Sequence, residues 1–267
     1  MGIRQLTEAD REQTLQFLQA ESALNLFLIG NIYNQGLNQE FQQFWGDFDT
    51  TGQLRGVLHR YRGNWIPWAP EALDVEGFAE VISTGQEIEM LSGVDRVTEQ
   101  FQGIPGLPFR WEKRRQTHFA CLTDVDGWGQ MEREIPFSIR RMTLEDVPML
   151  SHLSEQIAEF DRGGQAEELR ASLKSGAARG YWVEDGDQAV AMVRTAAENP
   201  ASAMVVGVGT HSAYRRQGLA TQLMIRLCRE VWDEGKSLCP FYDNPRAGAI
   251  YRRLGFREIG FWNMIGV

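Results

Sequence analysis

The chain has 267 residues, of which 43% are hydrophobic and 24% charged, the balance of a globular protein with a large apolar core. Its formal net charge of −9 and its short basic clusters exclude a general affinity for the phosphate backbone of nucleic acids. It has no apolar run long enough for a membrane helix, and its N-terminus does not read as a secretory signal. The three cysteines lack metal-ligand or redox spacing. We therefore expect a cytoplasmic protein with no metal and with neither nucleic-acid nor membrane partners.

The first segment of the chain returns in its second half. Residues 3–10 read IRQLTEAD, and residues 139–146 read IRRMTLED. Each copy predicts a short strand, a threonine N-cap with an acidic residue nearby, and then an amphipathic helix. This echo favours a tandem duplication.

Strand-like runs follow in the same order in both halves, separated by turn residues. The predicted strands are Phe41–Phe48, Leu54–Tyr61 and Trp65–Trp68 in the first half, and Tyr181–Glu184, Ala189–Ala196 and Ala203–Gly209 in the second. Alternating helices and strands predict a layered α/β (α+β) fold. The polar segment Thr123–Pro136 is the expected boundary, which gives domains 1–125 and 126–267.

A strand, a loop and a helix follow one another from residue 203 onward. Ala203–Val208 is apolar, Gly209–Tyr214 is a loop, and an amphipathic helix begins near Arg216 with Leu219 on its apolar face. The first amides of a helix have no partner inside it, and the peptide dipoles place partial positive charge at that end. Gly218 and Ala220 leave room for phosphate oxygens to reach these amides. The segment therefore predicts a pyrophosphate site.

This segment resembles a known cofactor signature. Val208–Ala220 is similar to the acetyl-CoA motif of the GCN5-related N-acetyltransferase (GNAT) superfamily, whose loop reads Arg/Gln-x-x-Gly-x-Gly/Ala. Arg215, Gly218 and Ala220 occupy its three defining positions. Ser212 stands where family members frequently carry proline, and this departure removes no phosphate contact.

A second segment also resembles the superfamily. Asn244 precedes a short helix that ends in Tyr251–Phe256, YRRLGF, similar to the family's Tyr-x-x-Leu-Gly-Phe. The resemblance implies that Asn244 contacts the pantetheine arm or orders the helix. It also implies that Tyr251 protonates the leaving thiolate as the catalytic acid.

Together the two motifs imply an acyl-CoA N-acyltransferase fold, with mixed, mostly antiparallel sheets flanked by helices. The implied activity is direct transfer of an acetyl or other acyl group from acetyl-CoA to a primary amine, without a metal. A backbone amide at Val208 or its neighbour is the implied donor to the thioester oxygen. The implied cofactor-binding residues are Val206, Val208, Gly209, Thr210, Arg215, Arg216, Gln217, Gly218, Leu219, Ala220, Thr221 and Asn244.

The general base stays open, because Ala203–Thr210 contains no acidic residue. His211, Glu184, Glu198 and a water relay are the alternatives. The loop Glu159–Gly164 lies where relatives often contact the acceptor.

The first half lacks the cofactor loop. Ala69–Gly77 carries acidic residues where a phosphate would need amides and arginines, so we expect a degenerate domain that binds no cofactor. The acceptor, a small-molecule or peptide amine, is not specified by the sequence. A non-catalytic acyl-CoA-binding or sensing protein and a purely structural tandem domain remain as alternatives.

Overall fold

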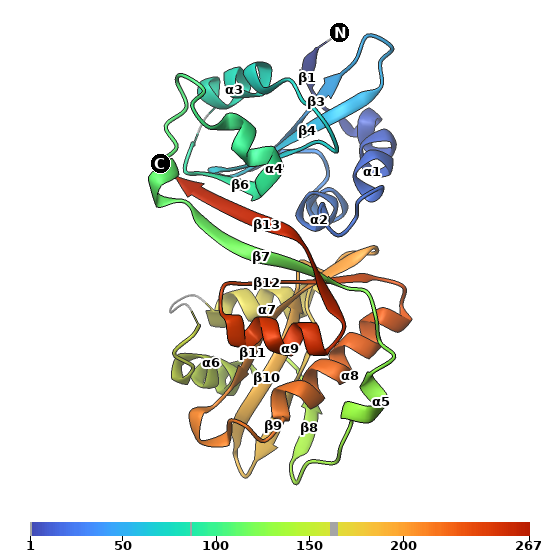
Figure 1. Cartoon of the computed structure of the whole chain (residues 1–267), viewed down its shortest axis with the longest axis vertical. Coiled ribbons are helices and arrows are strands. Elements are labelled where there is room, and N and C mark those ends of the chain that lie inside the picture. Colours follow the sequence, from blue (N-terminus) through green and yellow to red (C-terminus); the bar gives the residue numbers. More distant parts are fainter. Residues whose placement is uncertain (1, 86, 161–164) are drawn as a thin grey trace. The chain divides into compact units, whose positions relative to one another are not determined.

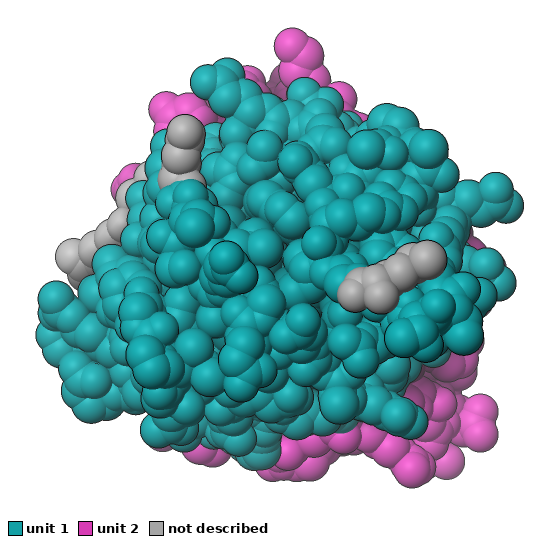
Figure 2. All heavy atoms as spheres, turned by 90° about the horizontal axis from the view of Figure 1, so that it is seen from above, with its two compact units in different colours: residues 1–119, 259–267 teal, residues 120–258 magenta. Residues whose placement is uncertain are grey.

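The computed structural model describes residues 2–85, 87–160 and 165–267. The chain forms two compact units, residues 1–119 with 259–267 (unit 1) and residues 120–258 (unit 2), which are coloured separately in Figure 2. The predicted boundary after residue 125 lies slightly beyond this division. The return of the C-terminal residues to unit 1 is a feature that the sequence pattern did not indicate. No helix within the described ranges combines the length and the apolar character that crossing a membrane requires.

Unit 1 is built on a mixed sheet. Its strands are β1 (Ile3–Gln5), β2 (Asn38–Gln39), β3 (Gln42–Phe48), β4 (Leu54–Tyr61), β5 (Asn64–Trp68) and β6 (Met90–Val94). The order is β1-β3-β4-β5-β6, with antiparallel pairs up to β5 and a parallel β5–β6 pair, and β2 pairs with β3. Residues 262–266 of β13 (Phe256–Gly266) pair antiparallel with β6.

Helices complete unit 1. They are α1 (Arg11–Gln19), α2 (Leu26–Gln35), α3 (Val75–Thr84) and α4 (Asp95–Thr98), with 3-10 turns at Glu8–Asp10, Glu99–Phe101 and Trp111–Lys113. Large side chains that are fully buried include Phe44, Trp65, Phe78, Phe101 and Phe119. Phe44, Phe48, Trp65 and Trp68 of the predicted strands thus belong to the core, whereas Phe41 is exposed.

Strand β7 (Arg115–Leu122) leads from unit 1 into unit 2, which repeats the plan (Figure 1). Its strands are β8 (Ser138–Arg141), β9 (Gly180–Asp185), β10 (Gln188–Ala196), β11 (Ser202–Thr210) and β12 (Ser237–Tyr242). The order β8-β9-β10-β11-β12 again has three antiparallel pairs followed by one parallel pair. Both units thus share strand order and strand direction.

Helices lie on both faces of this second sheet (Figure 1). They are α5 (Trp128–Met131), α6 (Val147–Gln156), α7 (Gln165–Ser175), α8 (Leu219–Asp233) and α9 (Pro245–Arg253), with a 3-10 turn at Ser212–Tyr214. One apolar cluster joins the stripe of α8 to Tyr251 of α9 and to side chains such as Val205. A second cluster joins α6 and α7 to Trp182 and Met192 on the other side.

The sequence echo forms the same local structure twice. The backbone amide of Thr7 donates to the Asp10 carboxylate at 2.8 Å, and the amide of Thr143 donates to Asp146 at 2.8 Å. Each threonine hydroxyl also donates to the same carboxylate. These bonds fix the entry from the first strand into the first helix of each unit.

Candidate functional site

Strands β11 and β12 separate partway along their length. Their parallel register runs from Ser202–Ser237 to Val205–Pro240, and among the described residues it continues no further. Pro240 has no backbone N–H to donate to a ladder. Beyond this point Val206–Thr210 lines a cavity of about 930 Å³. The separation therefore leaves a strand edge facing the cavity.

A bulge bends β11 at the same place. Met192 of β10 pairs with Gly209 and Arg194 pairs with Val206, so β11 carries one extra residue between these pairs. Gly207 within it has φ of 61°, in the left-handed region that glycine adopts without a steric penalty.

Gly209 is a second position where the backbone needs glycine. A Cβ atom there would lie 2.5 Å from Cδ1 of Ile157 and 2.7 Å from Cζ of Phe160. Both side chains follow α6 and line the cavity. The connection after α6 therefore packs directly on the strand edge.

The predicted phosphate loop forms the start of α8. Gly218 is the N-cap residue with φ of 78°, and no side chain caps the helix. Arg215, Arg216, Gly218, Leu219, Ala220 and Thr221 all line the cavity. The amides at this end are consequently available to an anion. Leu219 is itself buried in the core beneath α8, so only its backbone suits such a contact.

Gln217 is the one predicted cofactor residue that does not line the cavity. Its carbonyl oxygen accepts a hydrogen bond from the Arg133 guanidinium. Arg133 is placed there because its backbone amide donates to Gln222 of α8 at 3.1 Å, while the Gln222 amide group donates to the Met131 carbonyl at 2.9 Å. The expected boundary segment Thr123–Pro136 is thus hydrogen-bonded to the phosphate loop and to the first turn of α8.

Positive charge predominates around the cavity. The lining arginines are Arg133, Arg215, Arg216, Arg246 and Arg253, and the lining acidic residues are Glu132, Glu159 and Asp243. Five cations against three carboxylates favour an anionic ligand.

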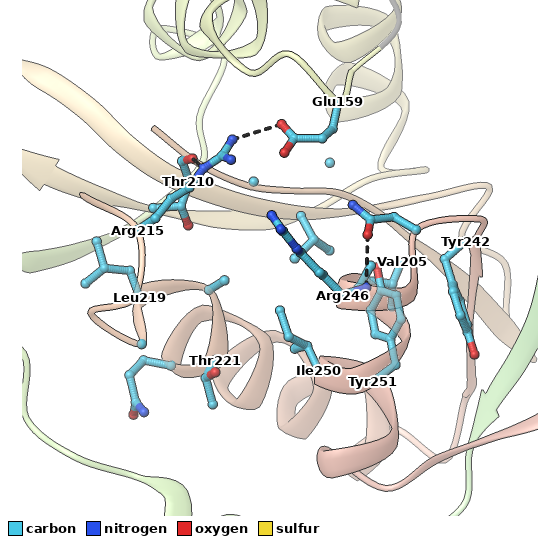
Figure 3. Close-up of a pocket in the computed structure, with 18 of the residues that line it drawn as sticks. Glu159, Val205, Thr210, Arg215, Leu219, Thr221, Tyr242, Arg246, Ile250 and Tyr251 are labelled. Carbon is cyan, nitrogen blue, oxygen red and sulfur yellow. Dashed lines mark hydrogen bonds and ion pairs between the residues drawn. The ribbon is translucent and has the colours of Figure 1, made fainter. Parts of the chain in front are cut away.

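One ion pair crosses the site (Figure 3). Nη2 of Arg215 lies 2.9 Å from Oε2 of Glu159, and its Nε donates to the Thr210 carbonyl at 3.2 Å. The hydrogen bond from Arg215, aided by the charge of Arg246, lowers the pKa of Glu159. Glu159 thus holds a loop arginine that a phosphate would also attract.

Asn244 orders the start of α9. Its side-chain oxygen accepts from the Arg246 amide at 2.9 Å, so it is the helix N-cap as well as a lining residue. The Arg246 side chain extends from this end into the cavity (Figure 3). Nearby, the Arg253 guanidinium donates to the Thr221 hydroxyl at 2.9 Å.

Tyr251 lies on α9 at the cavity wall with only 6% of its surface exposed. Its ring packs 5.4 Å from that of Tyr242 and 5.5 Å from that of Phe256. Its hydroxyl makes no hydrogen bond to any other residue that the structure describes. Burial raises the pKa of Tyr251, so the phenol holds its proton at neutral pH.

None of the three side chains considered as the base lines the cavity. Glu184 pairs with Arg140 at 2.8 Å, and the ring of His211 accepts from the Ala213 amide. Glu198 is buried in an ion cluster with Arg179. Each of the three side chains thus already has a partner outside the cavity. Of the loop considered for the acceptor, Glu159 and Phe160 line the cavity, while residues 161–164 lie outside the described residues.

Several lining residues escaped sequence reasoning. Ile157, Phe160, Met204, Val206 and Phe241 give the cavity an apolar part. Val206 was predicted as a cofactor contact and Phe160 as part of the acceptor loop, whereas Ile157, Met204 and Phe241 carry no motif. Arg246 and Arg253 did have a signal, since both stand within the second motif segment. Within residues 2–85, 87–160 and 165–267, no group of three or more His, Cys, Asp or Glu side chains is arranged to hold a metal ion.

The profile of the acetyltransferase (GNAT) family matches residues 147–256. Solved structures resemble nearly the whole chain. A Drosophila protein shares 16% identity at a TM-score of 0.71, covering 99% of this chain and 98% of its own. A tandem GNAT protein from the clavulanic acid biosynthesis pathway shares 15% identity at a TM-score of 0.62, and the match covers 99% of this chain and 97% of that protein. A GCN5-related N-acetyltransferase from Sphaerobacter thermophilus shares 12% identity at a TM-score of 0.63, and the match covers 99% of this chain and 94% of that protein.

These similarities over both units confirm the predicted tandem fold. No curated protein sequence matches the chain.

Proposed function

We propose that the chain transfers an acetyl group from acetyl-CoA to a primary amine, and the match of residues 147–256 to the acetyltransferase (GNAT) family supports this proposal. One observation carries the proposal. A single cavity joins the uncapped start of α8, the separated edge of β11 and the buried Tyr251. An anion site, an extended groove and a proton donor therefore meet in one place.

The lining residues suit coenzyme A. Amides at Gly218–Thr221 offer donors to a pyrophosphate, and Arg215, Arg216 and Arg253 add positive charge. The edge at Val206–Thr210 offers backbone groups to the amides of a pantetheine arm, as an added strand would use them. The volume of about 930 Å³ falls in the range of cofactor pockets.

Coenzyme A supplies the thioester that activates the acyl group. Val208 or a neighbour donates its backbone N–H to the carbonyl oxygen as the amine nitrogen bonds to the acyl carbon. Tyr251 donates its proton to the sulfur as the carbon–sulfur bond breaks. The attacking amine loses its own proton to a base that we leave unassigned, with water as the simplest choice.

The raised pKa of Tyr251 suits this role. Burial disfavours the phenolate as well as the thiolate, so the phenol gives its proton to the leaving sulfur and regains one from the proton that the amine releases. We place the protein in the cytoplasm, because no disulfide joins its three cysteines.

Thiol release from acetyl-CoA, measured across a panel of amines, tests the activity. Wild type is expected to turn over at least one amine, and coenzyme A is expected to raise its melting temperature. Stabilisation without turnover of any amine would instead indicate a sensing protein. Absence of both would leave a structural tandem domain and overturn the proposal.

A further inference from the structure

Arg194 on β10 is a buried cation with poor partners. Only 13% of its side chain is exposed. Its guanidinium lies 3.8 Å from the carboxylate of Glu168 and 3.5 Å from the Thr195 carbonyl, and these are its only polar contacts among the described residues. Both distances are at or beyond the limit of a hydrogen bond. Burial lowers the pKa of Arg194 below its ordinary value, because the charged form is desolvated.

Another arginine of unit 2 shows how the chain compensates such burial. Arg179 is 18% exposed and pairs with the carboxylates of Glu198, Glu230 and Glu234. Arg194, at similar burial, faces one carboxylate on an exposed residue of α7. A guanidinium has five donors, and the described residues give those of Arg194 only these two long contacts. The arrangement therefore leaves room for a partner beyond those that the described residues provide.

Arg194 lies beside the separated strand edge. It pairs directly with Val206 across the ladder, so the two side chains share one face of the sheet. A Cβ atom on Gly207 would lie 3.4 Å from the Cγ atom of Arg194. Val206 and Gly207 both line the cavity. The guanidinium thus stands directly behind the cavity wall.

The face that Arg194 occupies is opposite to the one that α8 covers. Met192, two residues earlier on β10, packs with α6 and α7, and Glu168 lies on α7. Ile157 and Phe160 line the cavity from the same side. Because the phosphate loop begins α8 on the other face, the proposed cofactor site leaves the α6–α7 side of the cavity free for an acceptor.

We propose that Arg194 binds a carboxylate of the acceptor, so that the acceptor is an amine that also carries a carboxylate, an amino acid being the simplest. This inference rests on the proposed acetyltransferase function. The planar guanidinium fork matches a carboxylate with two parallel hydrogen bonds. A bound carboxylate would also supply the partner that a buried cation requires.

The same chemistry has a second source, a carboxylate on the transferred acyl group. The place of Arg194 on the α6–α7 face favours the acceptor. Comparing acetyl-CoA with succinyl-CoA distinguishes the two. If substitution of Arg194 changed only the selectivity between these donors and left the acceptor KM unchanged, the assignment to the acceptor would be wrong.

The first experiment measures thiol release from acetyl-CoA with the twenty amino acids and with their α-amides. For the best amino acid we expect kcat/KM about 10- to 100-fold above that of its amide, the value of a hydrogen bond to a charged group. Turnover of carboxylate-free amines alone would overturn the inference and leave the proposed function intact. Loss of all turnover together with loss of coenzyme A binding would instead remove the proposed function.

The second experiment separates recognition from structure. Arg194→Met should remove the preference for the carboxylate and raise the acceptor KM about 10- to 100-fold, with an unchanged KM for acetyl-CoA. Its melting temperature should stay equal or rise, because an apolar side chain replaces a buried charge without short partners. Glu168→Gln, the matched control, should leave the acceptor KM unchanged.

Arg179→Met is the structural contrast. It removes one cation from three carboxylates, which keep only Lys236 or Arg141, and should lower the melting temperature. If Arg194→Met and Glu168→Gln both lowered the melting temperature and neither altered acceptor preference, Arg194 would be a structural ion-pair residue and the inference would fail.

Discussion

The starts of α3 and α8 occupy equivalent positions in the two units, each following the strand that pairs in parallel with the next one. At α3 the Asp74 carboxylate accepts from the Gly77 amide at 2.9 Å, so the chain caps its own helix. At α8 the N-cap is Gly218, and no side chain fills the end. One helix end holds an internal anion, and the other leaves its amides to an external one.

The charge around the two helix starts differs as well, with a carboxylate beside α3 and arginines beside α8. The Asp74 amide donates at 3.0 Å to Asp47, a fully buried carboxylate. Beside Gly218 stand Arg133, Arg215 and Arg216 instead. Two copies of one fold therefore differ in ligand capacity through a few residues at one helix end, which is why function has to be argued from the site.

Converting the α8 end into an α3-like end should have the largest effect. Gly218→Asp places a carboxylate where the phosphate is expected, on a backbone with φ of 78°. We expect KM for acetyl-CoA to rise roughly 100- to 1000-fold, from like-charge repulsion at short range and backbone strain. Initial rates across acetyl-CoA concentrations measure it.

Gly235→Asp is the matched control, because Gly235 follows α8 at its other end with φ of 75° and open space around it. It carries the same strain and charge far from the loop and should leave KM unchanged. Equal effects from both variants would show that general destabilisation, and not a phosphate site, explains the loss.

The second difference between the units is the helix after the parallel strand, where unit 2 has α9 with Tyr251 and unit 1 has the short α4. Tyr251→Phe should lower kcat about 100-fold, the contribution of a general acid, with little change in coenzyme A binding. Tyr242→Phe is the control, because the Tyr242 hydroxyl already donates to Glu258 at 2.8 Å. Similar losses from the two variants would reject Tyr251 as the acid.

The pH profile gives an independent test of Tyr251. Its pKa is raised by burial, so the acid stays protonated as pH rises through the ordinary tyrosine range near 10. The kcat of wild type should therefore show no decline from tyrosine ionisation below about pH 10. A decline there that disappears in Tyr251→Phe would mean that the phenol is not shielded as the structure indicates.

The sequence predicted those parts of the site whose physics is local. The apolar run before Gly218, the loop and the helix stripe all lie within neighbouring residues. The helix α8 begins at Leu219, slightly later than the predicted start near Arg216, because Gly218 adopts a left-handed conformation as its N-cap. The tandem plan was predictable because the Thr143–Asp146 cap repeats an earlier motif at the same spacing. Local structural propensity and an internal repeat can both be recognised in a single amino-acid sequence.

Features that depend on distant partners were not predictable. Arg133 meets the phosphate loop only because Gln222 anchors its backbone. The bulge at Gly207 depends on the register of β10, and the pairing of β13 with β6 joins residues 262–266 to residues 90–94. The weak pairing of Arg194 emerges only once the facing helix is in place. None of these carries a local signature.

A smaller effect concerns the ion pair that unit 2 places across its site. Glu159→Gln removes a competitor for Arg215, so the guanidinium becomes available to phosphate. We expect coenzyme A to bind about 2- to 5-fold more tightly, the size of a partly exposed ion pair, as measured by calorimetry at low salt. Glu184→Gln, which breaks the comparable pair with Arg140 away from the cavity, should have no effect. Weaker binding in Glu159→Gln would mean that Glu159 positions Arg215 instead of competing for it.

The smallest expected effect lies in unit 1 and completes the comparison. Asp74→Ala removes the cap of α3 and should lower the free energy of unfolding by about 1 kcal/mol, while KM for acetyl-CoA stays unchanged. Asp74→Asn should restore most of the stability, because an asparagine oxygen caps about as well. Denaturant unfolding and initial rates on the same samples measure both quantities. If Asp74→Ala instead created a second coenzyme A site, the carboxylate alone would be what keeps the first unit from binding, and the missing arginines would matter less than the cap.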